Sequence, residues 1–107
     1  MKNLAIARRY AKALMLIGKA DGNAETYRDE LERVTGLITD NSDLELAITN
    51  PLYDAAGRKR LLLSVVEKLN LSEVVRSFLL LVFDKGRIGF LSSINEFYQR
   101  LDRKSVV

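Results

Sequence analysis

Apolar residues recur with helical spacing along most of the chain, and no segment alternates strictly between apolar and polar positions. Between residues 24 and 39, for example, the apolar side chains fall on one face of a helix and charged side chains occupy the other face. That apolar face consists of Tyr27, Leu31, Val34 and Ile38. The pattern predicts an all-α protein, folded as a six-helix bundle in a single domain without a sheet.

Polar or glycine-containing joints separate six predicted helices. The first five helices cover approximately residues 3–20, 24–39, 43–49, 55–69 and 73–86. The sixth begins at about Gly89 or Leu91 and ends at about Arg103. Ser42, Asp54 and Ser72 are expected N-caps, because a short polar side chain can accept a hydrogen bond from a free amide of the first turn. Ser42 also has Glu45 three residues later, which is the spacing of a capping box. No joint is long enough to divide the chain into two domains.

The fifth predicted helix is more apolar than one core face requires, because six consecutive apolar residues run from Phe78 to Phe83. One stripe would suffice for the core and contains Val75, Phe78, Leu79 and Val82. A second stripe runs along its flank and contains Val74, Ser77, Phe78 and Leu81. Leu81 is left over once the core face has been assigned.

The first predicted helix shows the same surplus. One stripe contains Leu4, Ala7, Ala11 and Leu14, and a neighbouring stripe contains Ile6, Tyr10, Ala13 and Ile17. The charged residues of this helix are expected on the remaining side and are Arg8, Arg9, Lys12 and Lys19. Ala13 is small enough to let a partner backbone approach closely.

Two interpretations of this surplus stay open. In the first, both helices are central and the other four helices cover them. In the second, they border a groove that accepts an amphipathic helix of another protein, a recognition mode with anchors at i, i+3, i+4 and i+7. An apolar groove left open on a monomer would otherwise promote aggregation.

The composition limits which catalytic, metal and cofactor sites the chain can form. The chain has neither histidine nor cysteine, and its glycines lack the spacing of a phosphate-binding loop. We therefore expect no catalytic site, no metal and no cofactor.

The net charge of +3 is mild, but the chain has two basic clusters, Arg8-Arg9-Lys12 and Arg58–Arg60. These clusters leave a helical nucleic-acid-binding domain as an alternative function. Acidic residues interspersed through the chain favour reading these clusters as solvated faces.

The N-terminus superficially resembles an export signal, because Arg8-Arg9 precede an apolar stretch. Lys12 interrupts that stretch, and no clear small-residue cleavage site follows. A cytosol-facing domain fits better.

The same residues carry a resemblance to a known family. The segment "IARRYAKALMLIGKADG", residues 6–22, resembles the start of the delta subunit of bacterial F-type ATP synthases, whose mitochondrial counterpart is the oligomycin-sensitivity-conferring protein. Further features of that family follow in order along almost the whole chain, namely Asn50-Pro51, Phe78-Leu79, Gly86-Arg87 and Leu91.

The resemblance implies a non-catalytic stator component of the ATP synthase, on the cytoplasmic face of the bacterial inner membrane as part of a peripheral membrane complex. It implies that residues 1–107 are the N-terminal helical domain, and that the C-terminal domain, which binds the b-subunit stalk, is absent from this sequence. The implied partner is the N-terminal helix of an alpha subunit, with no nucleic acid and no direct membrane insertion. The implied groove between the first and fifth helices is lined by Ile6, Tyr10, Ala13, Ile17, Val74, Ser77, Phe78 and Leu81.

Overall fold

The computed structural model describes the backbone of residues 4–105 and the side chains of residues 4–102. Its elements are α1 (Leu4–Asp21), α2 (Ala24–Thr39), α3 (Ser42–Thr49), α4 (Ala55–Lys68), α5 (Glu73–Asp84), the 3-10 turn η1 (Ile88–Phe90) and α6 (Leu91–Ser105). No strand occurs within the described backbone. The predicted all-α six-helix bundle is confirmed.

The starts of three helices, α3, α4 and α5, follow from local capping by a side chain. Asp54 accepts a hydrogen bond from the amide of Gly57 at 2.9 Å, and Ser72 accepts one from the amide of Val75 at 3.4 Å, as expected. The prediction that Ser42 caps α3 is wrong. The cap is Asn41, whose side chain accepts a hydrogen bond from the amide of Leu44 at 3.1 Å, while Ser42 is already helical. Asparagine is at least as good an N-cap as serine, and here it lies one residue earlier.

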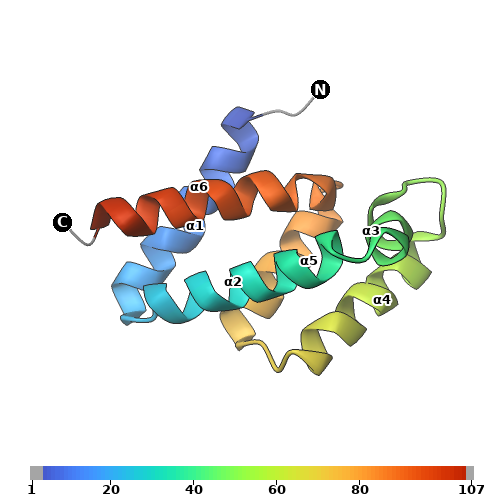
Figure 1. The fold of residues 1–107 in the computed structure, drawn as a ribbon, viewed down its shortest axis with the longest axis horizontal. Helices are drawn as coiled ribbons and strands as arrows, with labels where there is room; N and C mark the ends of the chain where they lie inside the picture. The colour runs from blue at the N-terminus through green and yellow to red at the C-terminus, as the bar shows by residue number, and fades with distance from the viewer. Residues whose placement is uncertain (1–3, 106–107) are drawn as a thin grey trace.

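The helices form a closed group and a hairpin that extends from it (Figure 1). The α6 helix crosses α1 and runs beside α2, and these three helices share the most extensive contacts of the fold. The α3 and α4 helices pack on each other at the opposite end, and α5 passes between the two parts, against α2 and α4. Two chain segments far apart in sequence, the beginning and the end, therefore pack together.

The core is continuous through the bundle. Fully buried side chains come from every long helix, namely Leu14, Leu31, Leu62, Leu79, Ile94 and Tyr98. The first stripe of α1 is buried at Ala7, Ala11 and Leu14, but Leu4 is 52% exposed. Leu4 shares that stripe but is the first residue of α1. None of the helices within residues 4–105 is both long and apolar enough to cross a membrane.

Gly18 permits the close turn between α1 and α2. A Cβ atom at this position would lie 2.7 Å from the Cα atom of Ala24. Because Ala24 contributes backbone at that point, the neighbour cannot rotate away. Glycine is therefore required for the first two helices to approach as they do.

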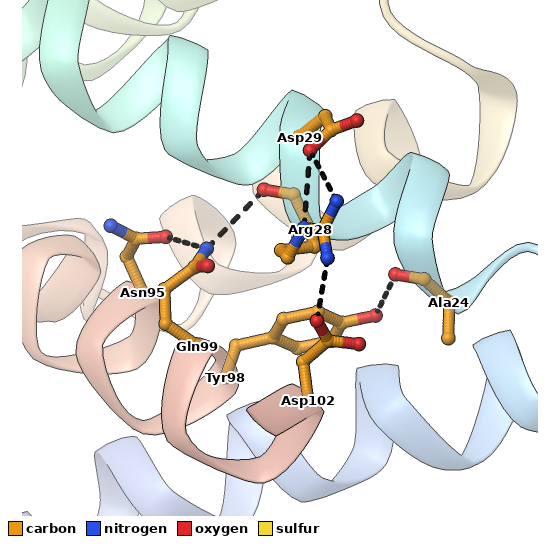
Figure 2. A network of polar contacts seen from close by, with 7 residues as sticks. All are labelled: Ala24, Arg28, Asp29, Asn95, Tyr98, Gln99 and Asp102. Atoms are coloured by element: carbon orange, nitrogen blue, oxygen red, sulfur yellow. Dashed lines mark hydrogen bonds and ion pairs between the residues drawn. The ribbon is translucent and has the colours of Figure 1, made fainter. Parts of the chain in front are cut away.

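A polar network joins α2 to α6, and we call this contact the α2–α6 seam (Figure 2). The guanidinium of Arg28 donates to the carboxylate of Asp102 at 2.8 Å, and the hydroxyl of Tyr98 donates to the carbonyl of Ala24 at 2.7 Å. Gln99 donates to the carbonyl of Arg28 at 3.3 Å. Burial raises the pKa of Tyr98, and the hydrogen bond to Asp102 raises the pKa of Arg28.

Candidate functional site

A groove of about 600 Å³ lies between α1 and α5. All eight residues predicted for the partner-binding site line it, four from each helix. Those residues are Ile6, Tyr10, Ala13, Ile17, Val74, Ser77, Phe78 and Leu81. The structure therefore brings the two surplus stripes together on one surface. Their role in binding a partner stays a prediction.

The floor of the groove is an aromatic contact. The rings of Tyr10 and Phe78 meet edge to face, with centroids 6.2 Å apart and an interplanar angle of 77°. Phe78 is only 7% exposed, because it belongs to both the core stripe and the groove stripe of α5. Such an edge-to-face pair is a favourable aromatic geometry and holds the two helices at a fixed spacing here.

The walls of the groove are apolar and uncovered. Ile17 is 46% exposed and Leu81 is 48% exposed, while Ala13 and Ser77 present small exposed side chains between them. The described part of the chain therefore leaves Ile17 and Leu81 of the second stripes about half exposed, whereas the first of the two interpretations expects these stripes to be covered. Small residues flanked by large apolar ones suit a helix that lies lengthwise between the walls.

One end of the groove is closed by Arg87. A pair of backbone hydrogen bonds ends α5, from the amide of Gly86 to the carbonyl of Phe83 and from the amide of Arg87 to the carbonyl of Val82, both at 2.9 Å. This Schellman arrangement needs a positive φ, and Gly86 supplies +72°. The reversed chain brings the guanidinium of Arg87 to the hydroxyl of Tyr10, to which it donates at 3.1 Å.

The other end of α5 is fixed by a carboxylate from α2. Glu30 is 7% exposed and accepts two hydrogen bonds from Ser72, from its amide at 2.8 Å and from its hydroxyl at 2.6 Å. A negative charge at a helix N-terminus is electrostatically favourable. Glu30 therefore anchors the wall of the groove that α5 forms.

Three charged residues of the groove were missed by the sequence-based prediction. Arg9, Glu73 and Arg87 also line it. Arg9 had been expected on the charged side of α1, yet it lies three residues after Ile6 and four before Ala13, so helical spacing could have placed it. Glu73 continues the stripe of Ser77 in the same way. Arg87 has no such local signal, since it lies beyond the end of α5.

The two basic clusters do not form one surface. One cluster is on α1 and the other on α4, and these two helices lie on different sides of the molecule (Figure 1). Arg58 is engaged within the fold, with its Nε donating to the carbonyl of Ile48 at 2.8 Å and its guanidinium 5.0 Å from the ring centroid of Phe83. Lys59 pairs with Asp84 at 3.2 Å. A continuous phosphate-binding track is therefore not assembled from these residues.

Among residues 4–102, no group of three or more acidic side chains lies close enough together to hold an ion.

Comparison with known proteins places the whole described fold in one family. The family model described as "ATP synthase delta (OSCP) subunit" matches residues 6–106. The chain is 61% identical over 101 residues to the ATP synthase subunit delta of Desulfatibacillum aliphaticivorans, which covers 94% of this chain and 55% of that protein. It is 52% identical to the ATP synthase subunit delta of Desulfosudis oleivorans and 50% identical to that of Desulforapulum autotrophicum, each with the same coverage. The chain thus spans about half the length of the curated relatives it matches. No solved structure matches it significantly.

Proposed function

The chain belongs to the family of ATP synthase delta (OSCP) subunits, and from that premise we propose that it is a non-catalytic stator component of an F-type ATP synthase. Its α1–α5 groove binds the N-terminal helix of an alpha subunit and so anchors the peripheral stalk to the catalytic head. The protein then acts at the cytoplasmic face of the bacterial inner membrane, within a peripheral membrane complex.

The observation that carries this proposal is the uncovered groove. Two helices of a folded domain expose adjoining apolar stripes, with Ile17 and Leu81 each about half accessible. Contiguous exposed apolar surface on a folded domain marks an interaction site. The spacing of the exposed positions fits the anchors of an amphipathic helix.

The groove supports a mechanical role. Rotation of a central shaft exerts torque on the catalytic head, and the head has to be held by a static contact. Fully burying one large apolar side chain contributes about 1.5–3 kcal/mol. Several such anchors offset the cost of ordering and immobilising the partner helix. The contact is rigid on the side of this chain, because α5 is fixed at both ends by Ser72 and Gly86.

A titration tests the proposal. A peptide with the sequence of the alpha-subunit N-terminus is expected to bind the chain, and Leu81→Asp is expected to abolish binding by introducing a charge that the complex would bury. Leu46→Asp is the matched control, because Leu46 is 52% exposed on α3, outside the groove. Loss of binding in both variants, or in neither, would contradict the groove as the site.

Salt dependence separates this function from nucleic-acid binding. Affinity that comes mainly from apolar contacts is expected to fall far less between low and high salt than affinity for phosphates. Binding of nucleic acid through Arg8, Arg9, Lys12 and Arg58–Arg60 would weaken steeply through counterion release. Steep salt dependence of the peptide complex would therefore count against an apolar groove contact.

Attachment to the stalk belongs, in this proposal, to the part of the relatives that this chain does not match. Residues 1–107 are then the N-terminal domain of the subunit, and a b-subunit fragment is not expected to form a complex with them. Co-elution of the two on gel filtration would overturn this assignment.

A further inference from the structure

The groove carries its charges at its ends. Among its lining residues the charged ones are Arg9, Glu73 and Arg87, and the others are apolar, aromatic or small. Glu73 is the first residue of α5, and Arg87 lies three residues beyond its last. A 12-residue helix rises about 18 Å, so the backbone of Glu73 and the backbone of Arg87 lie at opposite ends of the wall that α5 forms.

Arg9 belongs to the Arg87 end. It precedes Tyr10, the residue that Arg87 contacts through its hydroxyl at 3.1 Å. The directions of the two helices agree with this placement, because α1 and α5 run in opposite senses (Figure 1). The N-terminal half of α1 therefore lies near the end of α5. The half of the groove that leads to Arg87 therefore carries two arginines, and the opposite end carries the carboxylate of Glu73.

These charges are not neutralised within the domain. Within the described side chains, neither Arg9 nor Arg87 pairs with a carboxylate, and the nearby Asp84 is engaged by Lys59 at 3.2 Å. Glu73 pairs with Arg76 at 3.3 Å, but its side chain is 82% exposed. An exposed pair of this kind contributes little and leaves the carboxylate available to a partner.

The wall helices themselves impose no direction. The α1 and α5 helices run in opposite senses, so their macrodipoles oppose each other across the groove. Full charges on side chains then decide how a guest helix lies. Stable helices carry acidic residues in the first turn and basic residues in the last turn.

We propose that the two charged ends fix the direction of the bound helix: its acidic N-terminal turn lies at Arg9 and Arg87, and its basic C-terminal turn lies at Glu73. The guest then runs parallel to α1 and antiparallel to α5. This inference rests on the proposed function, since it concerns the same groove. The apolar stripes supply the affinity, and the charged ends select helices with this charge order.

Orientation is measured directly with a spin label. The probe is a synthetic amphipathic helix with a leucine stripe, acidic side chains in its first turn, basic side chains in its last turn and a nitroxide at its N-terminus. It is expected to broaden the amide signals of residues 86–88 and to leave those of residues 73–75 sharp. Broadening at residues 73–75, or equally at both ends, would overturn the proposed direction.

Charge variants test the cause of the direction. Glu73→Lys and Arg9→Glu are each expected to weaken binding of this probe by roughly threefold to tenfold at low salt. Their matched controls, Glu67→Lys and Lys12→Glu, make the same charge changes at exposed positions outside the groove and should leave binding unchanged. A second peptide with the same leucine stripe and neutral polar ends should bind all five proteins equally.

The outcomes separate the two proposals. If the neutral peptide binds while Glu73→Lys and Arg9→Glu leave the charged probe unaffected, the groove function stands and the role of the charged ends is wrong. If neither peptide, nor the alpha-subunit N-terminal peptide, binds the unaltered chain, both proposals fail.

Discussion

The α2–α6 seam and the α1–α5 groove are both formed by amphipathic helices, but only the seam is closed. At the seam, Tyr98 is fully buried and its hydroxyl is satisfied by a backbone carbonyl, while Asp102 is paired with Arg28 (Figure 2). At the groove, the aromatic floor is packed, yet Ile17 and Leu81 above it remain about half exposed.

The difference shows which helix faces are buried within the chain and which are left exposed to solvent. Buried polar groups need partners, and the seam supplies them from within the chain. Apolar groups need only to be covered, and at the groove the described chain leaves Ile17 and Leu81 about half exposed. A substitution at the seam should therefore lower stability, whereas a substitution at the groove should lower partner binding and leave stability intact.

The largest expected contrast is between Leu31→Asp and Leu81→Asp. Leu31 is fully buried on α2, so a carboxylate there would lose its solvation without a partner. That cost is comparable to the total stability of a domain, about 5–15 kcal/mol, and the variant should be unfolded by circular dichroism. Leu81→Asp should keep the helicity and melting temperature of the unaltered chain. If it melts the domain as well, the apolar run of α5 is core and the groove argument is wrong.

A pair of alanines makes the same comparison within α1. Ala11 is fully buried and Ala13 is exposed in the groove. Ala11→Leu overpacks the core and should lower the free energy of unfolding by about 1–3 kcal/mol. Ala13→Leu should leave stability nearly unchanged and weaken binding of the alpha-subunit peptide, because the added side chain occupies the space of the guest. Equal destabilisation by both, in urea unfolding, would show that the two faces of α1 do not differ.

Removing the charge of Asp102 should have a smaller effect. Asp102→Asn loses the ion pair with Arg28 at a site where the carboxylate side chain is 7% exposed. A decrease of about 1–2 kcal/mol in the free energy of unfolding is expected. Glu73→Gln removes the exposed pair with Arg76 at the groove and serves as the control, with no measurable loss. The reverse order of the two effects would contradict the assignment of the polar network to stability.

The smallest expected effect is on the pH dependence. Burial raises the pKa of Tyr98 above the ordinary tyrosine value of 10.0. The folded state therefore holds this proton more tightly than the unfolded state, so its stabilising contribution is present below pH 10 and is lost as pH rises above it. Melting temperature should fall between pH 9 and 11, with a shallower slope in Tyr98→Phe. Some slope should remain, because the hydrogen bond to Asp21 also raises the pKa of Tyr27. An unchanged slope in the variant would contradict the role of Tyr98.

Local sequence predicted the helices well because their signals act over a few residues. The bounds of α2 agree with the apolar spacing at residues 24–39, and the caps at Asp54 and Ser72 were expected. The error at Ser42 concerned two adjacent residues that can both cap a helix, and the hydrogen bond to the amide of Leu44 is made by Asn41. The 3-10 turn Ile88–Phe90, ahead of α6, carried no comparable signal.

The sequence by itself determined that α1 and α5 each carry two apolar stripes, because helical periodicity alone assigns residues to faces. Only the tertiary structure decided which stripe is buried, since that depends on where α6 and α2 lie. It also decided that Arg87 reaches Tyr10, 77 residues away, and that Glu30 holds Ser72, 42 residues away. Such contacts depend on the relative positions of helices, which short-range spacing does not encode. The groove therefore follows from the sequence as two surplus stripes, and among its charged residues the position of Arg87 follows only from the fold.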